Sequence, residues 1–319
     1  MKIIEDILLT KENFENTYVA IGAFDGIHMG HRELISQAVK KAKETGGKSV
    51  VFTFLNHPME VTNRVKAPKL ISSLEEKVHI IESLGVDYLI LQPFTQEFSN
   101  MTPQIFVERV LAELLKAKEI YVGFNFSFGK GGKGTVENLR QLGKQHKIFV
   151  NIIEPVKIKE QVISSTFIRE MLATGNLDIA NRCLGQPFLI IGEVVHGRKL
   201  GRIMGFPTAN LKILNKIYPP FGIYGGRVKI EGEQNWWHAV INIGKNPTLK
   251  PDERSIEVHI LDFDKDIYGK RIYVSLIEFL RQEKKFNSMD ELKETIKNDV
   301  LNWKEKVRVK ADGDCIKNR

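Results

Sequence analysis

In the first half of the chain, short apolar runs alternate with segments whose apolar residues recur at helical spacing. The apolar runs predict β-strands, and the segments between them predict amphipathic helices. The predicted strands are residues 18–24, 49–54, 88–91, 120–124 and 148–153. The predicted helices lie around residues 34–42, at 74–84, from 102 onward and at 136–142. Strands that alternate with helices favour a parallel sheet with helices on both faces.

The helical spacing fades after residue 187, and short β-rich runs separated by turn residues replace it. These predicted strands are residues 188–195, 225–230, 237–243, 256–261 and 271–279. Several short strands separated by turn residues favour a closed or nearly closed antiparallel barrel. A last helix is predicted to begin at Ser288 and to bury Leu292, Ile296 and Val300. We therefore predict an α/β domain at residues 1–185, a barrel domain at 186–308, and an unstructured tail at 309–319.

Composition and charge narrow the class of protein. The 47 Lys and Arg residues exceed the 39 Asp and Glu residues, but the two signs are interspersed. Such a surplus is first of all a general solubility charge, and it also suits an enzyme with anionic substrates. Cys183 and Cys315 are too few for a disulfide framework or a metal quartet. Neither a membrane-length apolar run nor a signal peptide is recognisable. The expectation is a cytoplasmic protein with no membrane or nucleic-acid partner; its oligomeric state is left open.

One candidate phosphate site follows the first predicted strand. Gly26 and Gly30 allow a ligand to approach the backbone closely. His28 and His31 are three residues apart at the start of a helix, so they share a face. The free N–H groups and the dipole of the helix start also favour an anion. The two imidazoles could stabilise the phosphates of ATP during nucleotidyl transfer, or they could merely cap a helix.

A second candidate phosphate site lies in the second half. Residues 192–202 form a basic loop punctuated by glycines, which permits close contact with phosphates. Thr208 and Asn210 are two apart, so their side chains point the same way in an extended segment. Their oxygens suit Mg²⁺, although an ordinary turn also accommodates both residues. Two separate phosphate sites suggest two ATP-dependent steps.

Seven segments carry a resemblance to the bacterial bifunctional riboflavin kinase/FAD synthetase family. In the first half, the segments that resemble its adenylyltransferase module are 22–31 (GAFDGIHMGH), 53–58 (TFLNHP), 123–129 (GFNFSFG) and 163–169 (ISSTFIR). In the second half, those that resemble riboflavin kinase are 201–210 (GRIMGFPTAN), 255–263 followed by 266–269, and 280–286 (LRQEKKF). The sequence departs from the family at Asn125 and Ser127, where many relatives carry Asp and Arg.

For the first half, the resemblance implies a Rossmann-like nucleotidyltransferase domain that transfers AMP from ATP to FMN, giving FAD. His28 and His31 would act in catalysis, and His57 and Pro58 would contact the flavin. The implied residues for ATP and its phosphates are Gly22, Phe24, Asp25, Gly30, Asn125, Ser164, Ser165, Thr166 and Arg169.

For the second half, the resemblance implies a barrel that phosphorylates riboflavin to FMN. Glu257 would be the general base, and Arg281 would lie near the flavin. Thr208 and Asn210 would hold Mg²⁺. The implied nucleotide-binding residues are Gly192, Gly197, Gly201 and Arg202.

Three alternatives stay open at this point. The departures at Asn125 and Ser127 permit a riboflavin kinase whose first domain is an impaired or regulatory flavin binder. Residues 129–134 satisfy Gly-x-Gly-x-x-Gly with Glu154 twenty residues beyond, which permits an NAD-binding oxidoreductase, although we interpret this segment as a loop over the adenylyltransfer site. A non-enzymatic nucleic-acid binder is the third, and it would show salt-sensitive binding.

Overall fold

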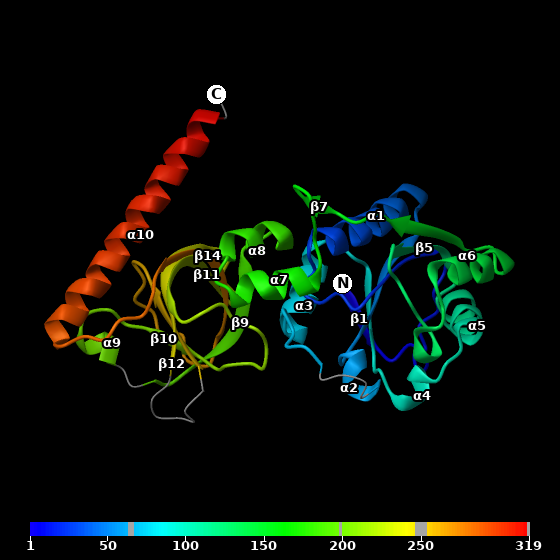
Figure 1. The fold of residues 1–319 in the computed structure, drawn as a ribbon, viewed down its shortest axis with the longest axis horizontal. Helices are drawn as coiled ribbons and strands as arrows, with labels where there is room; N and C mark the ends of the chain where they lie inside the picture. Colours follow the sequence, from blue (N-terminus) through cyan, green and yellow to red (C-terminus); the bar gives the residue numbers. More distant parts are fainter. Residues whose placement is uncertain (63–66, 198–199, 246–253, 318–319) are drawn as a thin grey trace. The chain divides into compact units, whose positions relative to one another are not determined.

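The computed structural model describes residues 1–62, 67–197, 200–245 and 254–317 (Figure 1). Its contacts divide the chain into two compact units. One comprises Met1–Ile168 with Cys183–Gly185, and the other comprises Arg169–Arg182 with Gln186–Arg319. The helical segment Arg169–Arg182 therefore groups with the second unit, whereas the sequence analysis assigned it to the first domain. No helix in the described ranges has the length and apolar character that crossing a membrane requires.

The first unit is built on a six-stranded sheet in the order β1-β4-β3-β2-β5-β6, and all its neighbouring strands are parallel. This confirms the predicted parallel sheet. The strands are β1 (Lys2–Glu5), β2 (Thr17–Ile21), β3 (Lys48–Phe54), β4 (Tyr88–Gln92), β5 (Ala117–Gly123) and β6 (Phe149–Ile153). The sequence analysis missed β1, of which only Ile4 is buried, because one buried position does not establish a periodicity.

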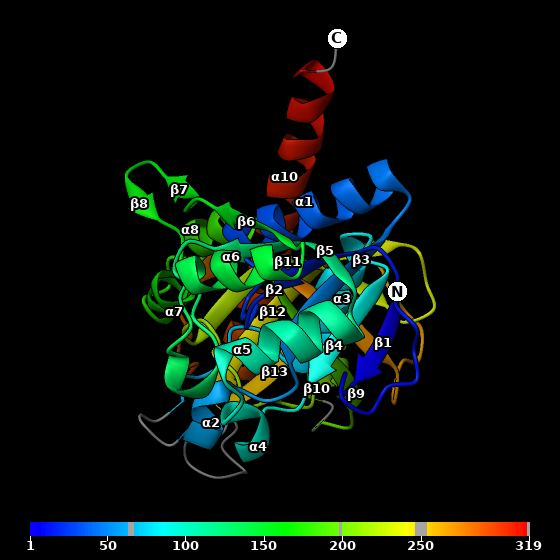
Figure 2. The same ribbon diagram turned by 90° about the vertical axis from the view of Figure 1, so that its right-hand side faces the viewer.

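Helices surround this sheet (Figures 1 and 2). They are α1 (Met29–Thr45), α2 (Pro58–Thr62), α3 (Leu74–Ser83), α4 (Gln96–Ser99), α5 (Pro103–Ile105), the π-helix η1 (Phe106–Leu114), the 3₁₀ turn η2 (Lys130–Gly132) and α6 (Val136–Gln145). A short hairpin, β7 (Lys157–Ile158) and β8 (Gln161–Val162), follows β6. The apolar stripe predicted at residues 34–42 is the buried face of α1, which packs on β2, β3 and β5.

The second unit is a closed barrel in the order β10-β13-β12-β11-β14-β9, with every neighbouring pair antiparallel. This confirms the predicted barrel. Its strands are β9 (Phe188–Val195), β10 (Ala209–Leu211), β11 (Gly222–Ile230), β12 (Trp236–Lys245), β13 (Arg254–Ile260) and β14 (Arg271–Arg281), and the short helix α9 (Leu200–Ile203) precedes β10. Along β13, Ile256, Val258 and Ile260 are buried, so Glu257 between them faces the other side of the barrel wall.

Three further helices complete the second unit: α7 (Ser165–Ala173), whose first turn belongs to the first unit, α8 (Leu177–Leu184) and α10 (Met289–Lys317). The Ser288 hydroxyl accepts a hydrogen bond from Glu291 N, so α10 begins where the sequence predicts. Trp303 is 1% exposed, the most buried of the α10 residues whose burial is described, whereas Leu292, Ile296 and Val300 are half-buried. The helix extends to Lys317, into the segment for which the sequence predicts no structure. Extending a formed helix adds one hydrogen bond for each residue fixed, which favours such a continuation.

Candidate functional site

The turn between β2 and α1 has an unusual backbone. Phe24 (φ 47°) and Ile27 (φ 43°) are left-handed although neither is glycine, and Gly26 (φ 82°) lies between them. Both apolar side chains are fully buried, so packing holds the strained conformation in place. A Cβ at Gly22 would lie 3.0 Å from the Phe24 ring, which explains a glycine there. The sequence analysis extended β2 to residue 24, but the strand ends at Ile21 because the chain turns here.

His28 and His31 meet at the start of α1. His28 is the N-cap, and its Nδ1 accepts a hydrogen bond from the His31 backbone N at 3.4 Å. The two rings stack with 3.6 Å between centroids and 18° between planes. Burial lowers the pKa of His28 to about 4. Burial, helped by His28 and Lys77, lowers the pKa of His31 well below 6.5. Both rings are therefore neutral at pH 7, and each carries one N–H donor.

Two other predicted phosphate-site residues, Asp25 and Ser165, make hydrogen bonds at the same turn. The Asp25 carboxylate accepts hydrogen bonds from the backbone N atoms of Ile71 (2.9 Å) and Ser72 (3.3 Å). The Ser165 hydroxyl donates to the Asp25 carbonyl at 2.9 Å. Ser165 therefore brings the start of α7 to the β2–α1 turn, as the sequence predicts for one phosphate site.

The remaining residues of that segment lie along the same helix. The Ser164 hydroxyl accepts a hydrogen bond from Phe167 N at 3.2 Å and so caps α7. Thr166 is exposed in the first turn, and Arg169 follows in the part of α7 that groups with the second unit.

A pocket opens beside the turn. Its lining includes Asp25, His57 and Pro58, together with apolar side chains. The apolar lining residues are Phe54, Leu55, Leu70 and Leu74. This places the two predicted flavin-contacting residues in one cavity with Asp25.

Lys77 also lines this pocket, and the sequence analysis did not identify it. Its side chain is only 9% exposed, and its ammonium donates to the Ala23 carbonyl at 2.9 Å. Burial lowers the pKa of Lys77 to about 8, while the Asp25 charge acts in the opposite direction. A sequence signal existed, because Lys77 stands three and four residues before the buried Ile80 and Ile81 of α3.

Asn125 and the glycine-rich segment 129–134 follow β5. Asn125 is exposed. Phe128 and Gly134 exchange two backbone hydrogen bonds, of 3.0 and 2.9 Å, that close the segment on itself. A Cβ at Gly134 would lie 2.7 Å from the Phe128 ring, and Gly131 adopts φ 69°. Local packing and backbone conformation thus explain glycines here without a dinucleotide ligand.

In the barrel, three polar residues stand side by side across neighbouring strands. Asn210 on β10 is directly opposite Glu257 on β13, and Glu257 is directly opposite Asn242 on β12. Directly opposite residues share a face, so the three side chains form one row. Asn210 and Glu257 are half-buried, and Asn242 Oδ1 is buried with no hydrogen-bond partner. The structure therefore brings together two residues that the sequence analysis proposed and a third that it missed.

The predicted glycines lie close to this row. A Cβ at Gly197 would lie 2.3 Å from Asn210 Nδ2. A Cβ at Gly201 would lie 2.4 Å from the Phe206 carbonyl oxygen and 3.3 Å from Thr208 Oγ1. Gly192 lies within β9, opposite Ile272 of β14. Arg198 and Lys199, which the sequence analysis included in the basic loop, lie outside the described residues.

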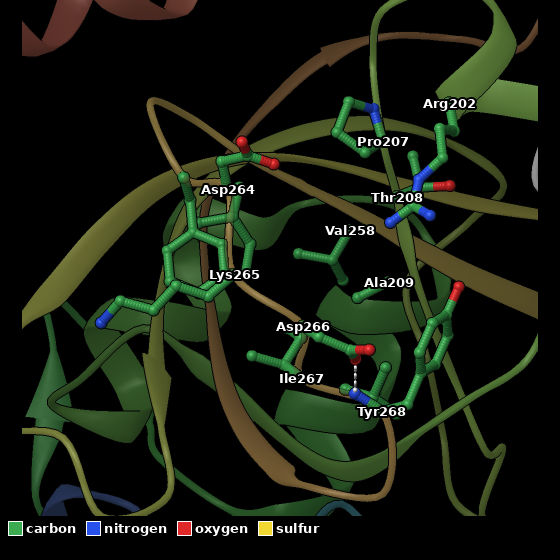
Figure 3. Close-up of a pocket in the computed structure, with 13 residues that line it drawn as sticks. Arg202, Pro207, Thr208, Ala209, Val258, Asp264, Lys265, Asp266, Ile267 and Tyr268 are labelled. Atoms are coloured by element: carbon green, nitrogen blue, oxygen red, sulfur yellow. Dashed lines mark hydrogen bonds between the residues drawn. The ribbon is translucent and has the colours of Figure 1, made fainter.

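A second pocket, of about 510 Å³ including its open mouth, adjoins β10 (Figure 3). Arg202 and Thr208 lie on one side of it, and Asp264 lies on the other. The Asp266 carboxylate accepts a hydrogen bond from Tyr268 N at 3.0 Å. Asn210 and Glu257 do not line this pocket; they flank it on the strand pair that carries the lining residues Ala209 and Val258. The pocket therefore lies next to the polar row.

Arg281, which was predicted near the flavin, binds Asp299 of α10. Its Nε and one terminal nitrogen donate to the two carboxylate oxygens at 2.8 and 2.6 Å. Asp299 is 7% exposed. This bidentate pair fixes the end of β14 to the last helix.

The two units define a class, that of proteins with an α/β domain on a parallel sheet and a closed antiparallel barrel domain. The family model described as FAD synthetase matches residues 10–167, and the one described as riboflavin kinase matches residues 184–307. Together these matches cover most of the chain, so both halves of a bifunctional flavin-nucleotide enzyme are present.

Whole-chain relatives agree with the two domain matches. The chain is 38% identical over 296 residues to the bifunctional riboflavin kinase/FMN adenylyltransferase of Bacillus subtilis, covering 91% of this chain and 92% of the relative. It is 36% identical over 306 residues to the protein of the same name from Escherichia coli K12, covering 96% and 97%. The chain belongs to the bifunctional riboflavin kinase/FMN adenylyltransferase family.

A solved structure supports the same architecture. A Streptococcus pneumoniae protein, described as a macrolide-efflux protein, shares 34% identity with a TM-score of 0.81, covering 94% of this chain and 97% of that one. The likeness concerns the whole chain, both units included. The described efflux role belongs to that protein and does not enter the assignment of this one.

Proposed function

We propose that this chain makes FMN and then FAD at two separate sites, with the residue roles given below. The barrel phosphorylates riboflavin, and the α/β unit transfers AMP from ATP to the FMN so formed. The observation that carries the proposal is the row Asn210–Glu257–Asn242, which places a carboxylate between two amides, with Gly197 packed closely against Asn210. The matching of both domain families over one chain supports the coupling of the two reactions.

In the kinase step, Glu257 accepts the proton of the terminal ribityl hydroxyl of riboflavin. That oxygen attacks the γ-phosphorus of ATP, the bond to the β-phosphate oxygen breaks, and ADP leaves. Gly197 and Gly201 let the nucleotide approach the backbone, because any larger residue would collide with Asn210 or with the Phe206 carbonyl. Gly192 and Arg202 complete the proposed nucleotide site.

A magnesium ion fits the oxygens at this place. Thr208 and Asn210 supply a hydroxyl and an amide oxygen next to the glycine loop, and the buried Asn242 Oδ1 lacks a partner in the same row. Hard oxygen donors with phosphate oxygens are the set that Mg²⁺ prefers. Thr208 and Asn210 would hold the ion, which would offset the negative charge of the ATP phosphates.

In the adenylyltransfer step, a phosphate oxygen of FMN attacks the α-phosphorus of ATP, and pyrophosphate leaves without a covalent enzyme intermediate. His28 and His31 are neutral, so they act as N–H donors toward phosphate oxygens and not as charged groups. Gly22 and Gly30 keep the backbone accessible, and residues Ser164–Thr166 with Arg169 supply further donors. Phe24, Asp25 and Asn125 complete the proposed ATP site, and His57 and Pro58 contact the flavin.

The proposed partners are small molecules in the cytoplasm, with no nucleic acid among them. Trp236 supports this view, because the Arg227 guanidinium lies over its ring at 4.6 Å. Trp237 packs edge-on against Phe263 with 5.3 Å between centroids. Both indoles therefore have protein neighbours on the barrel and do not form an open stacking platform.

Paired variants test the separation of the two sites. Glu257→Gln should reduce FMN formation at least about a hundredfold and leave FMN-to-FAD conversion within twofold, because only the barrel loses its base. His28→Ala combined with His31→Ala should do the reverse. Each activity is measured by chromatographic separation of flavins after supplying riboflavin or FMN with ATP.

Glu231→Gln and His146→Ala are matched controls, since the first residue is an exposed barrel carboxylate and the second ends α6. Both should retain both activities. Loss of both activities in either test variant, with the controls active, would argue against separate sites. Undiminished FAD synthesis in the double histidine variant would remove the role given to that pair.

A further inference from the structure

Lys77 is a buried cation in the pocket that holds His57 and Pro58. Its ammonium can donate three hydrogen bonds, and within the described part of the chain it donates one, to Ala23 O. It makes no ion pair with a carboxylate of the described residues. A charged group with unused donors and little exposure is unfavourable unless an anion pairs with it.

The pocket around this ammonium has two kinds of wall. Phe54, Leu55, Leu70 and Leu74 are apolar, as a flat aromatic ring system requires. Lys77 is the one lysine or arginine among the described lining residues. Asp25 also lines the pocket, but its Oδ1 already accepts two backbone N–H groups. Apolar walls with an ammonium suit an aromatic ligand that carries an anionic group.

The same ammonium reaches the turn that carries the histidines. It bonds the carbonyl of Ala23, five residues before His28. Its charge also contributes to the lowered pKa of His31, so the two groups are close enough to interact. Lys77 thus stands between the pocket and the β2–α1 turn.

We propose that Lys77 binds the phosphate of FMN and holds it toward the turn of His28 and His31, where the α-phosphate of ATP is attacked. This rests on the proposed function, because it takes the pocket of His57 and Pro58 as the FMN site. Lys77 is then a residue of substrate binding and orientation in the second reaction. The kinase reaction does not involve it.

Lys77→Met tests the role because it keeps the length and apolar stem of the side chain. Ala23 O still accepts a hydrogen bond from Thr53 Oγ1, at 3.1 Å, so the turn stays tied to β3. We expect the KM for FMN to rise about tenfold to a hundredfold, because the variant loses one hydrogen bond between charged groups. The KM for ATP and the rate of riboflavin phosphorylation should stay within twofold.

Lumiflavin separates phosphate recognition from a structural effect. It has the flavin ring but no ribityl phosphate, and its inhibition of FAD formation reports binding at this site alone. Its inhibition constant should be the same in Lys77→Met and the wild type. The exposed Lys40→Met on α1 is the matched control and should leave all these constants unchanged.

A pH series adds a second readout. Burial lowers the pKa of Lys77 to about 8, so the wild-type KM for FMN should climb as pH rises above 8. Asp25 and His31 are the titratable neighbours that interact with it, and burial keeps the His31 ring neutral because it lowers the pKa of His31 well below 6.5. The KM of Lys77→Met for FMN should not rise in this way above pH 8.

Three results would overturn the proposal. They are an unchanged KM for FMN, an equal weakening of lumiflavin and FMN, and a rise confined to the KM for ATP, which would assign the ammonium to the nucleotide. A wild-type chain that makes no FAD would instead contradict the proposed function, so the two failures are distinguishable.

Discussion

At the scale of single residues, burial decides the chemistry of the α/β site. His28 and His31 stack on each other in a place where solvent cannot stabilise a positive charge. Both are therefore neutral hydrogen-bonding groups at neutral pH. The sequence could place two imidazoles on one helix start, but it could not give their protonation state, which depends on the packing around them.

The protonation state of His28 makes stability depend on pH. Its pKa is lowered from 6.5 to about 4, so between these values the unfolded chain binds a proton that the folded chain does not. The free energy of unfolding should therefore fall as pH drops from 6.5 toward 4. His28→Asn, which keeps an N-cap side chain, should make this fall shallower. Urea unfolding of the first unit at several pH values measures it, and identical slopes for both proteins would contradict the lowered pKa.

At the scale of elements, the last helix depends on close packing against glycine. A Cβ at Gly225 of β11 would lie 2.3 Å from the Trp303 ring of α10. Trp303 also packs with Val240 and Leu261, which are both buried. A residue larger than glycine would therefore force the helix away from the barrel.

Gly225→Ala should destabilise the barrel by about 1–3 kcal/mol through overpacking. Trp303→Ala removes the ring with which the new methyl group collides. In that background, Gly225→Ala should lower the free energy of unfolding much less. Urea midpoints followed by circular dichroism for the two single variants and the double variant provide this comparison. Strictly additive effects would show that the Trp303 ring is not what requires glycine at position 225.

The elements also show where the periodicity of apolar residues is sufficient to predict a helix or a strand. The buried face of α1 and all of β9 follow the predicted pattern, because several consecutive positions repeat with one period. The strand β10 has three residues, too few to establish a period, and the spacing of Thr208 and Asn210 suited an extended segment without requiring one. Trp303 continues the spacing of Leu292, Ile296 and Val300, but only the packing on β11 explains its burial.

At the scale of the whole molecule, two separate patterns predicted two folds, and motif resemblance named the activities. The pairing of Asn210 with Glu257 joins residues 47 positions apart, and Lys77 bonds a carbonyl 54 positions away. No local pattern contains such contacts. Motifs therefore suggested the candidate residues. The helical spacing of Lys77 indicated only that it faces the core, and its place beside Ala23, like that of Asn242 beside Glu257, required the tertiary structure.

The central claim is that one chain carries both reactions. The most direct measurement supplies the purified chain with riboflavin, ATP and Mg²⁺ and follows the flavins by chromatography with fluorescence detection. FMN should accumulate first and then be converted to FAD. FMN that never becomes FAD would contradict the role of the α/β unit, and the absence of any conversion beside an active control enzyme would contradict the whole account.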